Sequence, residues 1–261
     1  MTTSSRRILI AALAVVFGLP LVLLLYLSVS TQWHYPALID HPFTLQHWHW
    51  LLQGHSPLVA SLGLSLGLSL TVGAVATLTG FAVSRLLAYH TRSTYWLLLA
   101  YAPYVIAPVI LAVMLNVYLL RIGLTGTVPG VAMAQLLITI PYAVLFFYGF
   151  WNERIRSMEH LVRTMGGDAQ TVFLHAIWPA ARGLLAVCFF QTFLISWFEY
   201  GLTQYIGVGK VQTLTVMVFR YVSEANPYLA ALAGVLLVTP PLTLLLVNRH
   251  VLVQRIWSHK R

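Results

Sequence analysis

The chain has 261 residues, of which 59% are hydrophobic and only 8% are charged, and its mean hydropathy is +0.81. Soluble domains of this length do not reach such values, so the composition excludes one and predicts a polytopic membrane protein. The single cysteine, Cys188, excludes an intrachain disulfide and a cysteine-based metal cluster. Because the sequence contains no long linker, low-complexity tail or repeat, we expect one membrane domain over residues 1–261.

The apolar segments predict an all-α fold with six membrane-spanning helices. The expected spans are residues 8–29, 57–84, 95–120, 128–151, 183–206 and 228–247. The first is long enough for the hydrocarbon core, at about 33 Å, and longer than the apolar part of a signal peptide, so we expect it to be retained. Prolines inside the third and fourth spans predict bends, and a short helix is expected at 213–222. Asn116 and Gln135 are polar residues within spans and are expected to hydrogen bond between helices.

The distribution of basic residues predicts the orientation in the membrane. If the N-terminus is cytoplasmic, three of the 15 Lys and Arg residues lie outside, namely Arg121, Lys210 and Arg220, and the others lie inside. This bias follows the positive-inside rule. It explains the pI of about 9.9 without nucleic acid as a partner.

A polar stretch, residues 153–182, separates the fourth and fifth spans on the predicted cytoplasmic side. Apolar residues recur in it at helical spacing, at Ile155, Met158, Leu161 and Val162. The remaining positions carry charge, at Arg154, Arg156, Glu159 and Arg163. The pattern predicts a short amphipathic helix with these charged residues on its polar side.

Two glycines, Gly166 and Gly167, end this helix and allow a tight reversal, because glycine adopts positive φ without steric cost. Asp168 follows as an expected N-cap of a second helix over 169–176. That helix shows Val172, Phe173 and Ala176 on one side, and Pro179 is expected to end it. The stretch is therefore predicted to form a helix-turn-helix lying flat against the cytoplasmic surface.

At these residues the sequence resembles the permease subunits of bacterial ABC importers that work with a substrate-binding protein. Their cytoplasmic loop carries E-A-A, three residues, G, a further run, then a hydrophobic residue and L-P. Gly166 and Pro179 match the Gly and the Pro, with Phe173 and Ile177 at apolar positions. The loop also lies between the fourth and fifth of six spans, as in the family, and the wider resemblance covers nearly the whole chain.

The sequence departs from the family motif at its front. His160 stands where the family Glu usually is, with Glu159 one residue earlier, and two larger apolar residues replace the two Ala. Trp178 replaces the Leu before the proline. These changes alter the side chains available to an ATPase, while the order of helix, glycine, helix and proline is kept.

The resemblance implies a type I ABC permease fold in the bacterial inner membrane, with both termini cytoplasmic and a coupling helix within 153–179. It implies a complex with two ATPase subunits, a second permease chain, preferably a different one, and an extracytoplasmic binding protein. ATP is then used by the partner, and this chain is not an enzyme and binds no cofactor or metal. The residues expected at the ATPase contact are Glu159, His160, Arg163, Gly166, Gly167, Asp168, Phe173 and Pro179. The alternative for the same stretch is an amphipathic helix resting on lipid headgroups.

Glu199 is the acidic residue that lies inside an apolar run, which makes it a site hypothesis. It is expected to attract a cationic solute or hold a gate through Gln191, Gln204 or the partner permease; otherwise it is an interfacial carboxylate in contact with water. The neighbouring aromatic residues Phe193, Trp197 and Tyr200 are expected either to stack on the solute or to serve as packing residues.

The stretches 45–48 and 213–221 look most like the second permease of polyamine-type systems. A cationic solute of this kind would suit Glu199, and the resemblance therefore extends to a polyamine or another small solute.

Catalytic motifs are missing from the sequence. It has no P-loop and no metalloprotease or serine hydrolase motif. Five histidines in the predicted outer loop, His34, His41, His47, His49 and His55, permit a metal hypothesis, although an ordinary polar loop is the simpler interpretation. The rival functions are a polytopic membrane enzyme and an ion-coupled secondary transporter, neither of which needs an ATPase.

Overall fold

The computed structural model describes residues 3–30, 43–52, 56–91, 94–106 and 108–258. Regular secondary structure in these ranges is helical, apart from an isolated bridge between Ser30 and Phe43. Three of the five loop histidines, His34, His41 and His55, lie outside the described residues. The all-α expectation is confirmed for the described part of the chain.

The chain divides into two compact units, residues 1–64 with 212–243 and residues 65–211 with 244–261. The sequence predicted one domain, and the boundary at residues 64 and 65 falls inside a continuous helix.

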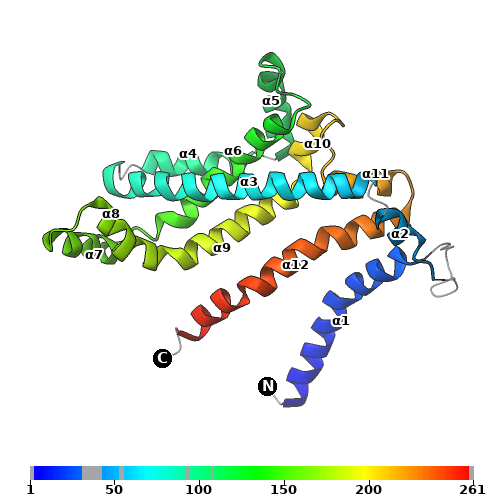
Figure 1. Ribbon diagram of the computed structural model, residues 1–261, viewed down its shortest axis with the longest axis horizontal. Coiled ribbons are helices and arrows are strands. Elements are labelled where there is room, and N and C mark those ends of the chain that lie inside the picture. The colour runs from blue at the N-terminus through cyan, green and yellow to red at the C-terminus, as the bar shows by residue number, and fades with distance from the viewer. Residues whose placement is uncertain (1–2, 31–42, 53–55, 92–93, 107, 259–261) are drawn as a thin grey trace. The chain divides into compact units, whose positions relative to one another are not determined.

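The first unit contains α1 (Thr3–Ser28), α2 (Gln46–Leu52), the start of α3 (Pro57–Leu86), α11 (Leu214–Ser223) and α12 (Pro227–Ser258) up to Thr243 (Figure 1). Gly234 of α12 faces the Leu24 side chain of α1. The His47 ring stacks on Tyr228, with ring centroids 5.9 Å apart. The short helix expected at 213–222 is present as α11, and Thr213 caps it by accepting from the Val216 N–H.

The second unit contains the rest of α3 and the helices that follow it. These are η1 (Leu87–Thr91), α4 (Thr94–Val105), α5 (Pro108–Arg121), α6 (Val128–Tyr148), α7 (Glu153–Thr164), α8 (Ala169–Val172), η2 (Phe173–Ile177), α9 (Trp178–Trp197) and α10 (Gly201–Gly207) (Figure 1). Gly80 of α3 lies against the backbone of Ala143 in α6, and Gly73 lies against Phe193 in α9. These close approaches make α3 the helix on which α6 and α9 pack.

Five helical segments in the described residues are long and apolar enough to cross a membrane, and a bent pair brings the number to six if it counts as one span. The five segments are Leu9–Ser28, Pro57–Tyr89, Val128–Tyr148, Ala169–Trp197 and Pro227–Leu245. The bent pair is Tyr95–Val105 with Val109–Arg121. The chain therefore has the composition and helix lengths of a multi-pass membrane protein.

The third predicted span, 95–120, is not one helix. It is broken into α4 and α5, which meet at an angle of 101°. Pro108 begins α5, and because proline has no N–H to donate and disfavours helical backbone before it, the helix cannot continue smoothly through this point. The predicted bend is thus a break between two helices.

The fifth predicted span, 183–206, is also wrong at both ends. The helical run begins at Ala169, inside the predicted polar stretch, and continues to Trp197. The chain then breaks at residues 198–200 before α10. Glu199 lies in this break and not inside a continuous helix.

The contact between α3 and α6 gives a test of the packing. In Gly80→Ala the new Cβ meets Ala143 and the backbone of Val144, so we expect a loss of about 1–3 kcal/mol in stability. Thermal unfolding of the purified chain in detergent measures it. Gly67→Ala in the same helix is the matched control, because a Cβ at Gly67 has no neighbour within 4 Å. Equal melting temperatures for the two variants would contradict the packing.

Candidate functional site

The polar stretch forms a capped helical hairpin made of α7, α8 and η2. Asn152 begins α7 by accepting from the Ile155 N–H. At the other end, the Gly166 N–H donates to the Arg163 carbonyl and the Gly167 N–H to the Val162 carbonyl, both at 3.0 Å. This pair of bonds is a Schellman motif, which uses the carbonyls left over at a helix C-terminus.

Both glycines of the turn are needed for different reasons. Gly166 has φ of +85°, which side chains with a Cβ rarely adopt. A Cβ at Gly167 would lie 2.7 Å from the Val162 side chain and 2.8 Å from its carbonyl oxygen. The sequence prediction of a tight reversal at these two residues is confirmed.

Asp168 caps α8, as predicted, because its carboxylate accepts from the Thr171 N–H at 2.9 Å. Its bonds to the Thr171 side chain and backbone hold the pKa of this exposed carboxyl below its ordinary value. Since the lowered pKa means that the charged form is favoured in the folded chain, the cap is lost only as pH falls through this lowered pKa.

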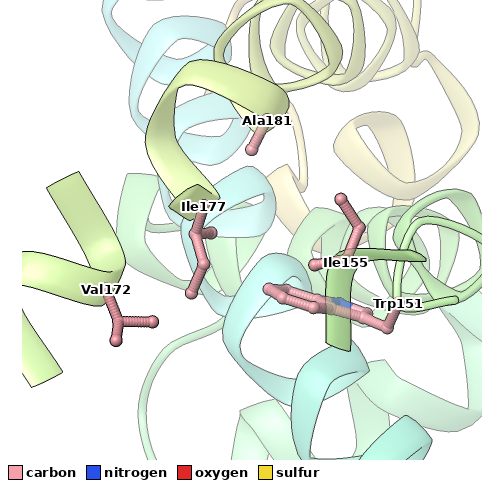
Figure 2. Packing of buried hydrophobic residues seen from close by; sticks show 5 residues of the cluster. All are labelled: Trp151, Ile155, Val172, Ile177 and Ala181. Carbon is pink, nitrogen blue, oxygen red and sulfur yellow. The ribbon is translucent and has the colours of Figure 1, made fainter. Parts of the chain in front are cut away.

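An apolar cluster holds the hairpin to the ends of the neighbouring helices (Figure 2). It contains five buried residues, namely Trp151 just before α7, Ile155 of α7, Val172 of α8, Ile177 of η2 and Ala181 of α9. The Trp151 indole N–H also donates to the Ser84 hydroxyl of α3 at 2.8 Å. The hairpin therefore rests on α3 through packing and through a directed hydrogen bond.

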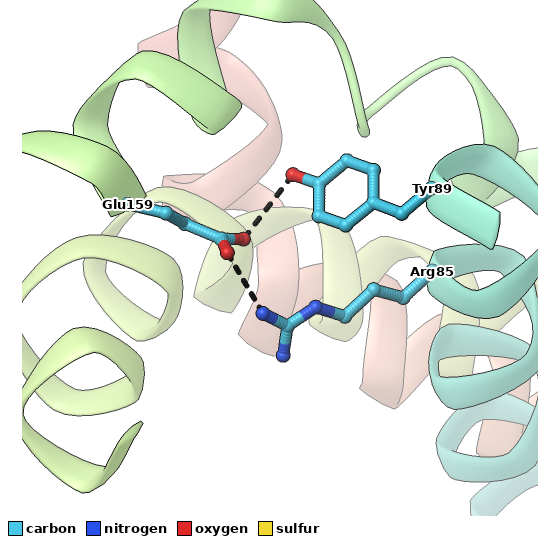
Figure 3. Close-up of polar contacts among 3 residues, drawn as sticks. All are labelled: Arg85, Tyr89 and Glu159. Carbon is cyan, nitrogen blue, oxygen red and sulfur yellow. Dashed lines mark hydrogen bonds and ion pairs between the residues drawn. The ribbon is translucent and has the colours of Figure 1, made fainter. Parts of the chain in front are cut away.

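A polar contact adds a second attachment between α7 and α3 (Figure 3). The Glu159 carboxylate accepts from the Arg85 guanidinium at 2.8 Å and from the Tyr89 hydroxyl at 3.2 Å. Glu159 is only 5% exposed. The expectation that Glu159 belongs to the outward polar side of α7 is wrong, because its carboxylate is used inside the chain.

The apolar residues of α7 separate into a buried and an exposed set. Ile155 and Val162 join the cluster, whereas Met158, Leu161 and the C-cap residue Met165 are exposed, the last two at 62% and 80%. These three residues, which we call the apolar stripe, lie on one flank of α7 at i, i+3 and i+7. On the adjacent arm Phe173 and Leu174 are exposed too. Exposed apolar side chains on so polar a helix form a patch of the kind that occurs at protein and membrane interaction sites.

The hairpin passes into α9 without an interruption. The sequence predicted that Pro179 ends the second helix, and this prediction is wrong. Pro179 lies in the first turn of α9, where its missing N–H is tolerated. The preceding π-helical turn η2 prepares this position, because the Trp178 N–H already donates five residues back, to the Phe173 carbonyl. The second arm and α9 are therefore one helical run.

The predicted coupling residues consequently occupy different places. Gly166, Gly167 and Asp168 shape the turn, and Glu159 faces α3. His160, Arg163, Phe173 and Pro179 are exposed. The structure thus leaves the last group, together with the apolar stripe, available at the surface of the hairpin.

Glu199 caps α10. One carboxylate oxygen accepts from the Leu202 N–H at 2.6 Å, and the other accepts from the N–H and the hydroxyl of Thr203 at 2.9 and 2.8 Å. Of its expected partners, Gln191 instead accepts from the Tyr142 hydroxyl. The carboxylate is therefore held by the helix that follows it, where its charge also meets the positive end of the helix dipole.

A chain of buried polar groups continues from Thr203 into the unit. Thr203 accepts from the Gln135 amide at 3.1 Å, and the Gln135 oxygen accepts from Ser196 at 2.6 Å. The Ser196 and Ser69 hydroxyls are 3.2 Å apart. The predicted interhelical bonding of Gln135 is confirmed, since it joins α6 to α9 and α10. The described bond of Asn116 differs from the prediction, because Asn116 accepts from Thr125 in the turn after α5.

Phe193 and Trp197 are fully buried and stack on each other, with centroids 5.5 Å apart. Tyr200 is half-buried at the break before α10. Phe193 and Trp197 are thus packing residues of the second unit. The sequence had left open whether they pack or stack on a solute.

The described residues contain no group of three His, Cys, Asp or Glu side chains that could hold a metal ion. The sequence did not identify Arg85, Tyr89 and Trp151 as parts of the site. Arg85 was visible only as a basic residue flanking a span, and no local pattern connects it to Glu159.

A scan against protein-family models finds no match, and a search of curated proteins finds none either.

The contact of Glu159 can be tested by Glu159→Gln. The substitution removes the charge that pairs with Arg85, so we expect the amides of α7 to exchange about tenfold faster, which corresponds to about 1.4 kcal/mol. Hydrogen exchange of the purified chain measures this. Glu153→Gln is the control, since it removes the same charge from an exposed position of the same helix; equal exchange in the two variants would show that the contact does not anchor α7.

Glu199→Gln tests the cap of α10. With one oxygen left to accept, the exchange of the Leu202 and Thr203 amides should rise, and stability should fall by about 1 kcal/mol. Glu224→Gln, at an exposed pair in α11, is the control for loss of an acidic residue. A raised KM for a cationic solute with unchanged exchange at α10 would instead assign the carboxylate to solute recognition.

Proposed function

We propose that the chain is the permease subunit of an ABC importer, and that its α7–α8–η2 hairpin is the coupling element for a separate ATPase. The observation that supports this most is a rigidly capped hairpin with an exposed apolar stripe, inserted between apolar helices long enough to span a membrane. A polar hairpin that simply covered the helices would bury its apolar residues. This one exposes three of them beside Gly166 and Gly167.

The attachments of the hairpin suit the transmission of motion. Glu159 and Trp151 bind it to α3, and η2 continues it into α9. A partner that displaces the hairpin would therefore move two membrane helices together, since packed elements respond by discrete shifts and not by bending. ATP binding and hydrolysis by the partner would drive alternating access, and this chain supplies the pathway.

The proposal includes the orientation and the partners. With the N-terminus inside, twelve of the 15 basic residues lie on the cytoplasmic side, and this bias supports the proposal that the hairpin and both termini face the cytoplasm of a bacterial cell. The complex contains two ATPase subunits, a second and different permease chain, and an extracytoplasmic binding protein that delivers a small solute of the polyamine-type group. Because Glu199 caps α10, the recognition of a cationic solute is assigned to the binding protein and to the pathway as a whole.

The experiment is co-purification of the chain from its host membranes, with the captured ATPase identified by its peptide sequence and by nucleotide hydrolysis. Leu161→Glu with Met165→Glu places two charges on the apolar stripe, and we expect at least about a tenfold loss of bound ATPase, because truncating or charging the centre of an interface typically costs more than 1–2 kcal/mol. The chain itself should remain inserted and monodisperse.

The matched control is Leu161→Met with Met165→Leu, which keeps both positions apolar and should keep the ATPase. Retention of the ATPase by the charged variant, or after residues 153–179 are replaced by a flexible linker, would contradict the coupling role. Solute uptake by the isolated chain without any nucleotide-hydrolysing partner would favour an ion-coupled transporter instead.

A further inference from the structure

A cavity of about 470 Å³ opens between the end of α3 and the side of α7. Its lining residues are Arg85, Leu86, Tyr89, Arg156, Glu159, His160 and Arg163. Three of them are arginines and one is acidic, so the cavity is strongly basic. Arg85 is used to hold Glu159, and His160 and Arg163 also belong to the expected ATPase contact. Arg156 has neither role.

The single carboxylate does not neutralise the cavity. Both oxygens of Glu159 are engaged by Arg85 and Tyr89 (Figure 3). Arg156 lies over the face of the Tyr89 ring, with the guanidinium carbon 5.6 Å from the ring centroid. In the described part of the chain, neither Arg156 nor Arg163 forms an ion pair. Arg156 also lines a neighbouring cavity of about 390 Å³, together with Glu153. Arg163 does not line that cavity, and its side chain is more exposed than that of Arg156.

The basic residues form a stripe separate from the apolar stripe. Arg156, His160 and Arg163 follow one another at i, i+4 and i+7, so they share a flank of α7. Residues at these positions are displaced by about 100° to 160° around the helix from Met158 and Leu161, because each residue turns the helix by about 100°. A partner bound to the apolar stripe thus leaves the basic flank facing the end of α3.

The cavity also borders an apolar surface. Arg85 and Leu86 lie in the last turns of the apolar helical segment Pro57–Tyr89, and Leu86 and Val83 are 57% and 38% exposed. If this segment crosses the membrane, the cavity lies at the depth of the lipid headgroups. A ligand with an anionic head and an apolar body would contact the arginines and this surface together.

We propose that this cavity binds the phosphate headgroup of an anionic phospholipid. Arginine suits this role because its planar guanidinium donates two parallel hydrogen bonds to phosphate oxygens. Arg85 is already fixed by Glu159 and lies over the Trp151 ring at 5.4 Å, so it needs little ordering on binding. Basic pockets beside membrane helices on the cytoplasmic side are suited to such headgroups. The bound lipid would connect α7 to α3 beside the Glu159 contact.

The test uses the purified full-length chain without the ATPase, so that its outcome is independent of the proposed coupling role. Native mass spectrometry counts the phosphatidylglycerol retained per chain, with phosphatidylcholine as the neutral lipid. Arg156→Gln with Arg163→Gln should weaken phosphatidylglycerol binding by about tenfold or more, since each basic residue near a membrane surface contributes measurably to the attraction of anionic lipid. Arg85 is left unchanged because it holds Glu159.

The matched control is Arg154→Gln with Arg182→Gln, which removes two positive charges from exposed positions outside the cavity and should leave lipid binding unchanged. Circular dichroism and gel filtration verify that both double variants are folded. Equal lipid retention by the two variants would overturn the proposal. Displacement of the lipid by millimolar inorganic phosphate would overturn it in favour of a free phosphate site.

Discussion

The hydrogen-bonded ion pair between Arg85 and Glu159 is the interaction on which the arrangement of the hairpin depends. It joins the end of α3 to the middle of α7, and the Arg85 guanidinium also lies over the Trp151 ring. A buried carboxylate without a partner would be costly, so the pair fixes the rotation of α7 about its own axis. That rotation decides which residues of α7 are exposed.

With Glu159 turned toward α3, two flanks of α7 remain at the surface. One carries Met158, Leu161 and Met165, and the other carries Arg156, His160 and Arg163. The first is suited to an apolar groove on a protein and the second to a phosphate. One short helix thereby presents two chemically different surfaces, and both adjoin helices that are long enough to cross a membrane.

The sequence predicted the local features of this region well, because their causes are local. Gly166, Gly167 and Asp168 act on the backbone within a few residues of themselves, and all three do what their residue types favour. The burial of Glu159 could not be predicted in this way, since its partner Arg85 lies 74 residues earlier in the chain. The same reason applies to Glu199: its apolar surroundings indicated an intramembrane site, but the break at residues 198–200 makes it a cap for α10. Pro108 indicated a bend, and only the structure shows that α4 and α5 are separate helices.

The π-helical turn η2 has a consequence for helical register. On the second arm the buried residues Val172 and Ala176 are four positions apart. The next buried pair, Ile177 and Ala181, is also four positions apart, but it begins one residue after Ala176. The extra residue held in η2 accounts for this offset, because one residue corresponds to about 100° around a helix. If η2 tightened to an ordinary α-helical turn, the hairpin would swivel by about that angle relative to α9 while the chain stayed helical throughout. At η2, a change of helical twist would therefore rotate the hairpin relative to α9 without unfolding the chain.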